Sequence, residues 1–339
     1  MLNRMKKALI GIVFCGWFSQ LAAQEASSSY NVLRLPVSSH AAALGGENIS
    51  NIEDSPAAAW SNPALMSNVS DKSLGLSLMT YNSGSLYLGA QYVQAFGERH
   101  SASVMAQMLS YGSMDETDET GRVIGSVSAK DIVLGAGYSY LLSDEWAGGA
   151  TLRIIDQNYA GYTSIALGVD LGLNYFNEET DLSVSATARN IGAQVKSFYD
   201  GQSAHLPFTL QLGLTKGLEH LPVRFSVTMT DLTRWKSKYY FHPADVEKVS
   251  FGRMLTNHLV LGLDILPTDN IYLSLGYNAR RAYELKSADA GKMAGFTLGG
   301  GLNLRRLKLG VSYAKYHVDN ASLMFNVVYS FQASPNITR

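Results

Sequence analysis

Residues 164–175 read SIALGVDLGLNY, so large apolar side chains alternate with small or polar ones. Successive side chains of a strand point to opposite faces, whereas a helix has a period of about 3.6 residues and would mix the two sets. The stretch is therefore predicted to be a strand with one apolar and one polar face. The apolar face holds Ile165, Leu167, Val169, Leu171, Leu173 and Tyr175, and the other face holds Ala166, Gly168, Asp170, Gly172 and Asn174.

The same alternation recurs in fourteen segments between Ser73 and Gln332. Apolar residues on one face with Gly, Ser, Thr, Gln and Asp on the other suit a barrel with lipid outside and a polar lumen. A soluble β-sandwich gives the same alternation, but aromatic residues such as Tyr175 and Phe176 gather near segment ends, where the interface girdles of a membrane barrel lie. We therefore predict an all-β protein, a transmembrane antiparallel β-barrel of about 14 strands over residues 73–333. The segments begin near residues 73, 85, 99, 130, 145, 162, 180, 206, 221, 257, 270, 292, 306 and 321.

The composition agrees with a barrel. Charged residues make up 16% of the chain, whereas soluble domains average about a quarter. After residue 20 no stretch approaches the ~18 consecutive apolar residues of a transmembrane helix.

The connections between segments are unequal. The even-numbered ones are all short, and the four long ones are odd-numbered, so the long ones should lie at one end of the barrel. That end is extracellular if both termini are periplasmic. The long connections are 113–129, 191–205, 234–256 and 281–291.

The N-terminus has the pattern of a secretory signal peptide over residues 1–23. Arg4, Lys6 and Lys7 precede an apolar run, and Leu21-Ala22-Ala23 offers a cleavage site. The only cysteine, Cys15, lies inside the apolar run, so we expect no disulfide or thiolate metal site in the mature chain. The predicted location is the outer membrane.

Residues 24–72 do not alternate. Their small residues and turn signals predict a partly helical segment that starts in the periplasm and can fold into the lumen as a plug. A short tail, residues 334–339, follows the last strand.

No catalytic set emerges, and we expect neither enzyme activity nor a cofactor or metal. The seven histidines are scattered. Ser312 and Lys315 match the SxxK pattern of penicillin-recognising enzymes, but at this spacing a strand points them to opposite faces.

Charged residues also occur on the faces predicted to be luminal. A mixed-sign set inside a barrel most often forms a salt-bridged lining, and a path for a polar substrate is the alternative. The set comprises Arg153, Asp170, Arg189, Arg224, Asp264 and Lys308.

The 234–256 connection concentrates aromatic and cationic residues, the types that dominate protein-interface hot spots. It could dock a partner protein or rest as a lid on the rim and on lipopolysaccharide. The 113–129 connection is acidic and 281–291 basic, and these charges could steer a partner or pair with each other. The candidate partner-binding residues are Arg234, Trp235, Lys236, Lys238, Tyr239, Tyr240 and Phe241.

Two motifs resemble the start of the PorV/PorQ family of Bacteroidetes outer-membrane barrels, which is related to the FadL transporters. They are LPVSSHAAALGG at residues 35–46 and DSPAAAWSNPAL at residues 54–65. The wording and the chain length resemble PorQ more than the longer PorV. The resemblance implies a FadL-like barrel whose plug is shaped by Gly45, Gly46, Asn62, Pro63 and Ala64.

The same resemblance implies a non-enzymatic part of the type IX secretion system, a protein-secretion machine. The chain would anchor a surface partner such as PorZ in the attachment complex, together with PorU and PorV. The alternative is a FadL-like channel for a hydrophobic or small ligand. A channel needs a path and a pocket in its lumen, whereas an anchor can be packed solid. We expect no nucleic-acid partner.

Overall fold

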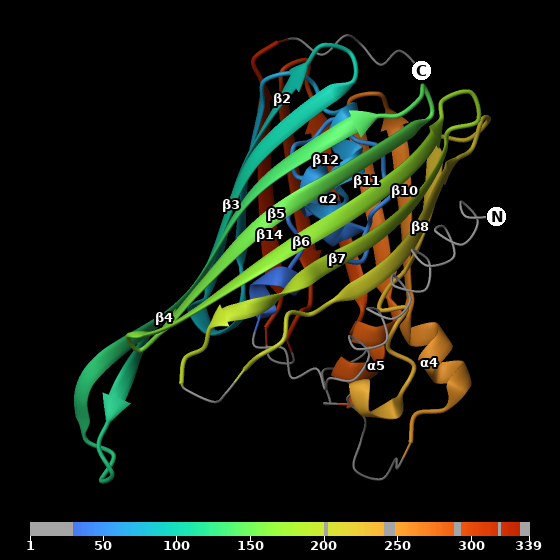
Figure 1. Ribbon diagram of the computed structural model, residues 1–339. Helices are drawn as coiled ribbons and strands as arrows, with labels where there is room; N and C mark the ends of the chain where they lie inside the picture. The colour runs from blue at the N-terminus through green and yellow to red at the C-terminus, as the bar shows by residue number, and fades with distance from the viewer. Residues whose placement is uncertain (1–29, 200–202, 241–247, 288–292, 318–319, 333–339) are drawn as a thin grey trace, which may run out of the picture.

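The fold is a closed barrel of fourteen antiparallel strands in which neighbours in sequence are neighbours in space (Figure 1). The barrel closes where β1 pairs with β14, and the hydroxyls of Ser73 and Ser330 lie 3.0 Å apart across that seam. This confirms the predicted fold class. The strands are β1 Ser73–Thr80, β2 Leu86–Phe96, β3 His100–Thr117, β4 Val123–Leu141, β5 Trp146–Tyr159, β6 Tyr162–Asn177, β7 Leu182–Lys196, β8 Thr209–Gly217, β9 Val223–Met229, β10 Leu259–Thr268, β11 Ile271–Asn278, β12 Phe296–Asn303, β13 Leu307–Ala314 and β14 Ser322–Ser330.

This computed structural model describes most of the chain. The predicted signal peptide, the C-terminal tail and Phe241 lie outside the described residues. Those residues are 30–199, 203–240, 248–287, 293–317 and 320–332.

Strand β6 shows the predicted two faces. Leu167 and Leu171 are exposed on the outside of the barrel, whereas Asp170 and Asn174 are fully buried inside it. Strand β14 alternates in the same way along its whole length. The period-two pattern therefore predicted correctly which residues face the lumen.

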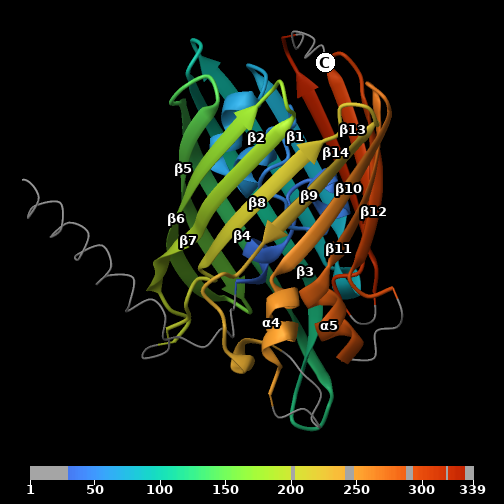
Figure 2. The same ribbon diagram turned by 90° about the vertical axis from the view of Figure 1, so that its right-hand side faces the viewer.

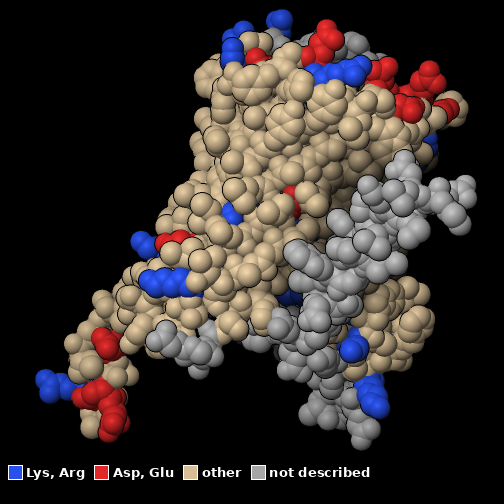
Figure 3. Space-filling view, in the orientation of Figure 1, with Lys and Arg blue, Asp and Glu red and all other residues tan. Residues whose placement is uncertain are grey.

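The outer surface is dominated by large apolar side chains, and Figure 3 shows a wide band with few charges, with Lys, Arg, Asp and Glu gathered at the two ends. Soluble monomers rarely expose contiguous apolar patches larger than a few hundred Å². A lipid-facing band is the arrangement that removes this surface from water, so the barrel is a transmembrane one.

The two ends of the barrel differ, as predicted. One end carries tight turns such as 97–99 and 143–145 and is called the turn end. The opposite end carries α4, α5 and the β3–β4 hairpin and is called the loop end (Figures 1 and 2).

The prediction of a long loop over residues 113–129 is wrong in detail. Only residues 118–122 connect β3 and β4, because both strands continue past the barrel rim as a projecting hairpin. Strand β4 therefore starts at Val123 rather than near residue 130. Above the membrane both faces of such a hairpin meet water, so the apolar alternation that marks the other strands is missing.

Short helices fill the lumen and cover the loop end. Among the described residues, no helix is long and apolar enough to cross a membrane. Those of the plug are η2 Asn31–Arg34, α2 Ser39–Ala43, α3 Ala58–Ser61 and η3 Pro63–Asn68, and those of the loop end are η4 Asn82–Gly84, η5 Ser237–Tyr239, α4 Phe251–Asn257 and α5 Ala279–Ser287.

The plug, residues 30–72, bridges the lumen. Helix α2 contacts β11 to β14, whereas η3 contacts β3 to β6 on the other side of the barrel. Tyr30, Trp60 and Met66 are fully buried between the plug and the wall. The plug thereby forms the apolar core that the polar lumen alone would lack.

Candidate functional site

The turns within the two plug motifs bring the backbone of the plug against the wall. Gly45 and Gly46 both have positive φ, and a Cβ at Gly45 would lie 2.4 Å from Cγ1 of Val260, so glycine is required there. Asn62 caps η3 by accepting a hydrogen bond from the amide of Ala64 at 3.0 Å, with Pro63 in the first helical position. The five predicted motif residues thus shape two turns of the plug.

His40 of α2 joins the plug to strand β10. Its Nε2 lies 3.0 Å from Asp264 and its Nδ1 lies 2.7 Å from Glu53. Burial alone would lower the pKa of His40, but the two carboxylates raise it well above its usual range. Both ring nitrogens therefore carry protons and donate to a carboxylate.

A second ion pair joins the plug to strand β13. The ammonium of Lys308 lies 2.6 Å from the Asp54 carboxylate and donates to the Asp54 carbonyl as well. Arg224 of β9 makes longer contacts, 3.4 Å each, with Asn51 of the plug and Asp181 of the wall.

The most buried charges form a third anchor. Arg153 of β5 pairs with Asp170 of β6, and its Nη2 donates to the carbonyl of Trp60 at 2.9 Å. Its guanidinium stacks 4.4 Å from the centroid of the Trp60 ring. Arg189 Nε lies 3.9 Å from the same Asp170.

The six residues predicted as luminal charges all lie inside the barrel, but only Arg153, Asp170 and Arg189 pair among themselves. The others find partners in the plug or in the 178–181 turn. The sequence reasoning missed His40, Glu53 and Asp54 because pairing a plug residue with a strand requires the path of the plug. The place of His40 and Asp54 within the two motifs was the only signal available, and Glu53 directly precedes the second motif.

A cavity of about 250 Å³ lies between the plug and the wall near the loop end. Plug residues 33–37 and 46–49 form one side, and β7, β8 and α5 contribute to the other. Its titratable lining residues are Arg34, Glu47, Tyr81, Arg189, Asp231, Arg280, Arg281, Glu284 and Tyr316.

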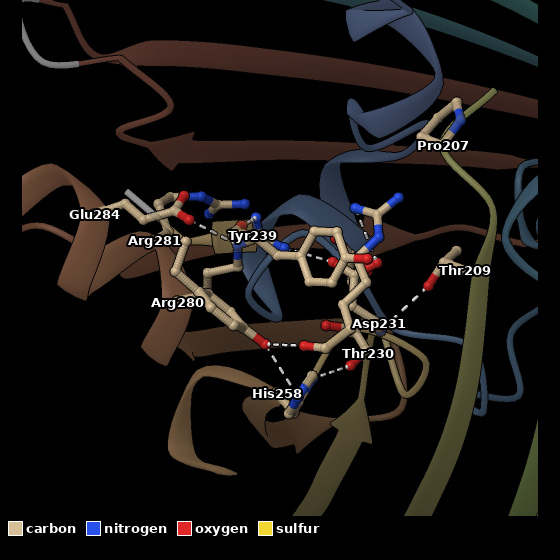
Figure 4. Close-up of polar contacts among 12 residues, drawn as sticks. Pro207, Thr209, Thr230, Asp231, Tyr239, His258, Arg280, Arg281 and Glu284 are labelled. Carbon is tan, nitrogen blue, oxygen red and sulfur yellow. Dashed lines mark hydrogen bonds and ion pairs between the residues drawn. The ribbon is translucent and has the colours of Figure 1, made fainter. Parts of the chain in front are cut away.

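Four of the charges around this cavity neutralise one another (Figure 4). Arg280 Nη1 lies 2.5 Å from Asp231, and its Nε lies 2.8 Å from Glu284. Arg234 lies 3.5 Å from Asp231. Burial alone would raise the pKa of Asp231, but the neighbouring guanidiniums hold it below its usual range.

Solved structures with the same architecture include transport proteins. The Pseudomonas putida toluene transporter TodX superposes with a TM-score of 0.54 at 16% identity, over 87% of this chain and 97% of that one. A Pseudomonas aeruginosa FadL homologue gives a TM-score of 0.53 at 10% identity over 87% and 98% of the two chains. The fold is FadL-like. The CymD monoaromatic hydrocarbon channel gives 0.54 at 13% over 88% and 98%.

These superpositions establish a shared fold. No protein-family model matches the sequence. No curated protein matches it either. The FadL-like part of the predicted resemblance is thereby confirmed at the level of fold, whereas the finer PorV/PorQ assignment remains a prediction.

Of the residues predicted to bind a partner, some fold against the rim of the FadL-like barrel and others are exposed. Arg234 and Tyr240 are buried, and the Tyr240 hydroxyl donates to the Arg234 carbonyl at 2.7 Å. The Trp235 ring lies 4.1 Å from the His258 ring but is 37% exposed. Lys236 is exposed and Tyr239 half-buried, while Lys238 belongs to η5. The stretch thus combines lid-like packing with exposed side chains, and both the lid and partner binding stay predictions.

Proposed function

We propose that this chain is an outer-membrane channel with a FadL-like fold, in which the plug controls the passage of a small ligand that binds in the lumen. The cavity between plug and wall is the observation that carries the proposal. A barrel that served only as an anchor has no need of a lined pocket in its lumen. The predicted signal peptide, the lipid-facing band and the unequal ends support the location and the orientation.

The contacts of the plug explain why its movement would control passage. It is held at both walls of the lumen by polar contacts, chiefly those of His40, Lys308 and Arg153, and by apolar packing such as that of Trp60 and Met66. The strand pairing of the barrel is continuous without these contacts, so the plug can shift without unfolding the barrel. Solutes would then pass along the wall beside it.

An engineered disulfide tests this proposal. A Cβ at Gly310 would lie 3.5 Å from the Cβ of Ser39 in α2, within the ~3.5–4.5 Å range of disulfides. The hydroxyl of Tyr272, at 2.8 Å from that Cβ, is the end of a side chain and must shift slightly. We expect Ser39→Cys/Gly310→Cys to block uptake when oxidised and to restore it when reduced.

The measurement is uptake of succinate, succinamide, benzoate and benzamide into proteoliposomes, each with and without reductant. Ser39→Cys alone is the matched control and should be insensitive to the redox state. Uptake that continues in the oxidised double variant, or no uptake above protein-free liposomes in the reduced one, would show that the plug is no gate.

A second candidate function is surface anchoring, favoured by the loop end. Phe251 and Leu255 of α4 and nearby Met293 are exposed there, beyond the apolar band. Apolar side chains at a membrane-distal surface are typical of protein interfaces. We propose this surface, defined by Phe251, Leu255 and Met293, as the docking place of a type IX secretion partner such as PorZ, with PorU and PorV in the same complex.

We expect Phe251→Ser/Met293→Ser to lose that partner while the barrel stays folded, since neither side chain is packed in the barrel. Affinity purification from outer membranes with mass spectrometry of co-eluting proteins measures this. Leu218→Ser, an exposed apolar residue at the turn end, is the control. Recovery of no secretion component with the unchanged protein would remove this candidate.

A further inference from the structure

The cavity has more cationic than anionic groups, and we propose that it binds a small hydrophilic organic anion such as a carboxylate, held by Arg281 and Tyr316. This inference rests on the proposed channel function and specifies its ligand. A small anion differs from toluene and the monoaromatic hydrocarbons for which the similar barrels TodX and CymD are named.

The charge surplus follows from the pairing around the cavity. Arg234 and Arg280 match Asp231 and Glu284, and these four groups form a neutral set. Arg153 and Arg189 share the single carboxylate of Asp170, so that group carries one excess positive charge. Arg34 and Arg281 add two more against Glu47. An anion is therefore the ligand that the electrostatics of this cavity favour.

Two donors beside the cavity also lack a partner. Among the described residues, neither Nη1 of Arg281 nor the hydroxyl of Tyr316 has a hydrogen-bond partner, although both atoms are buried. The guanidinium of Arg281 stacks over the Tyr316 ring at 4.3 Å, and both residues line the cavity. Buried donors are almost always satisfied in native proteins. A carboxylate accepts from both donors at once, whereas a hydrocarbon satisfies neither.

The plug sequence makes this arrangement possible at Gly46. A Cβ there would lie 2.7 Å from Nη2 of Arg281 and 3.6 Å from the Tyr316 hydroxyl. The positive φ of Gly46 also disfavours any other residue. One of the motif glycines thus lets the guanidinium approach the backbone of the plug.

The size of the cavity limits the ligand. A volume of about 250 Å³ holds roughly eight water-sized groups at about 30 Å³ each. Succinate and benzoate are of this size, whereas a long alkyl chain is not. The apolar lining residues Leu33, Leu35 and Ile49 leave room for a short hydrocarbon part.

The negative charge of Glu47 opposes anion binding, so removing that charge provides a second test of the anion site. Its Oε2 accepts a hydrogen bond from Gln211 at 2.6 Å, and burial raises its pKa, while Arg189, Arg281 and Arg34 act in the opposite direction. Glu47→Gln keeps an oxygen acceptor and removes the negative charge. This change should tighten anion binding by several-fold.

The test compares each carboxylate with its neutral amide by titration calorimetry on the full barrel in detergent. We expect succinate to bind more tightly than succinamide, and benzoate more tightly than benzamide. Arg281→Met should weaken carboxylate binding at least about tenfold, because it removes charge-assisted hydrogen bonds. Tyr316→Phe, which removes only the hydroxyl, should weaken it less. Arg122→Met, at the exposed tip of the β3–β4 hairpin, is the matched control and should change nothing.

Equal binding of acids and amides, or unchanged affinity in Arg281→Met, would overturn the anion site. A heat-modifiable band on a gel shows that each variant is folded. The two proposals fail separately. If uptake is redox-controlled but carboxylates are not preferred, the channel proposal stands and the anion site is wrong. If carboxylates bind but uptake is insensitive to the redox state, the anion site stands and the plug is no gate.

Discussion

Removal of residues 30–70 should turn the barrel into an open, water-filled pore. The plug occupies the lumen of a fourteen-stranded barrel, and the wall that remains carries polar side chains such as Gln91, Gln107 and Asn174 toward the inside. Barrels of this width keep an aqueous channel when nothing fills them. We expect the ion conductance in planar bilayers to rise at least about tenfold.

The barrel wall should survive this deletion because its strand pairing is continuous without the plug, from β1 to β14 and back to β1. A heat-modifiable gel band and a β-rich circular dichroism spectrum would establish folding. The control is Glu119→Gln in the exposed β3–β4 turn, which leaves the plug in place and should leave the conductance low. If the folded deletion variant had the same low ion conductance as the complete protein, something other than the plug would close the lumen.

The sequence predicted the barrel well because lipid and lumen impose the same rule on every strand. Strand β6 shows this clearly, since Leu167 must meet lipid and Asp170 must not. The same rule places each strand boundary where the alternation ends. The rule fails for the β3–β4 hairpin, where Met114 and Ile124 are both exposed beyond the rim.

Helices α4 and α5 were not predicted from the sequence, for a different reason. They lie in connections read as loops because of their aromatic and charged residues, yet capping signals were present. Ser250 accepts a hydrogen bond from the amide of Arg253 at 3.3 Å, and Asn278 accepts one from Arg281 at 2.9 Å. Ser and Asn before a short helical stretch are favoured N-caps, so these two residues would have marked both starts.

Only part of the candidate site could be predicted from the sequence. The alternation along each strand identified the charged wall residues that face the lumen. Which plug residues pair with them depends on how residues 30–72 cross the lumen, and this could not be predicted. His40 and Asp264 are 224 positions apart, and no local pattern connects them. The cavity is a gap between the plug and the barrel wall. Its shape depends on how these two surfaces pack, and the alternation of residues along a strand does not predict that.

Arg153→Met should produce the largest loss of stability of any single substitution in the wall. It removes the guanidinium from a buried pair and leaves the Asp170 carboxylate without its closest cation. Breaking a buried pair in this way costs about 3–5 kcal/mol. We expect the lower part of that range, because Arg189 remains 3.9 Å from Asp170 and the amide of Asn190 still donates to it at 2.7 Å. Unfolding by urea in detergent, followed by tryptophan fluorescence, measures the loss.

The double variant Arg153→Met/Asp170→Asn distinguishes a charge effect from a packing effect. The asparagine keeps the acceptor for the Asn190 amide and removes the uncompensated charge, so the double variant should be more stable than Arg153→Met alone. Replacing a buried ion pair as a unit is often neutral, whereas removing one partner is not. Arg122→Met, at the exposed tip of the β3–β4 hairpin, should change the unfolding free energy by less than about 0.5 kcal/mol. If the double variant were no more stable than Arg153→Met, the loss would come from what both variants lack, the stacking of Arg153 on Trp60, and the plug would be held by packing rather than by charge.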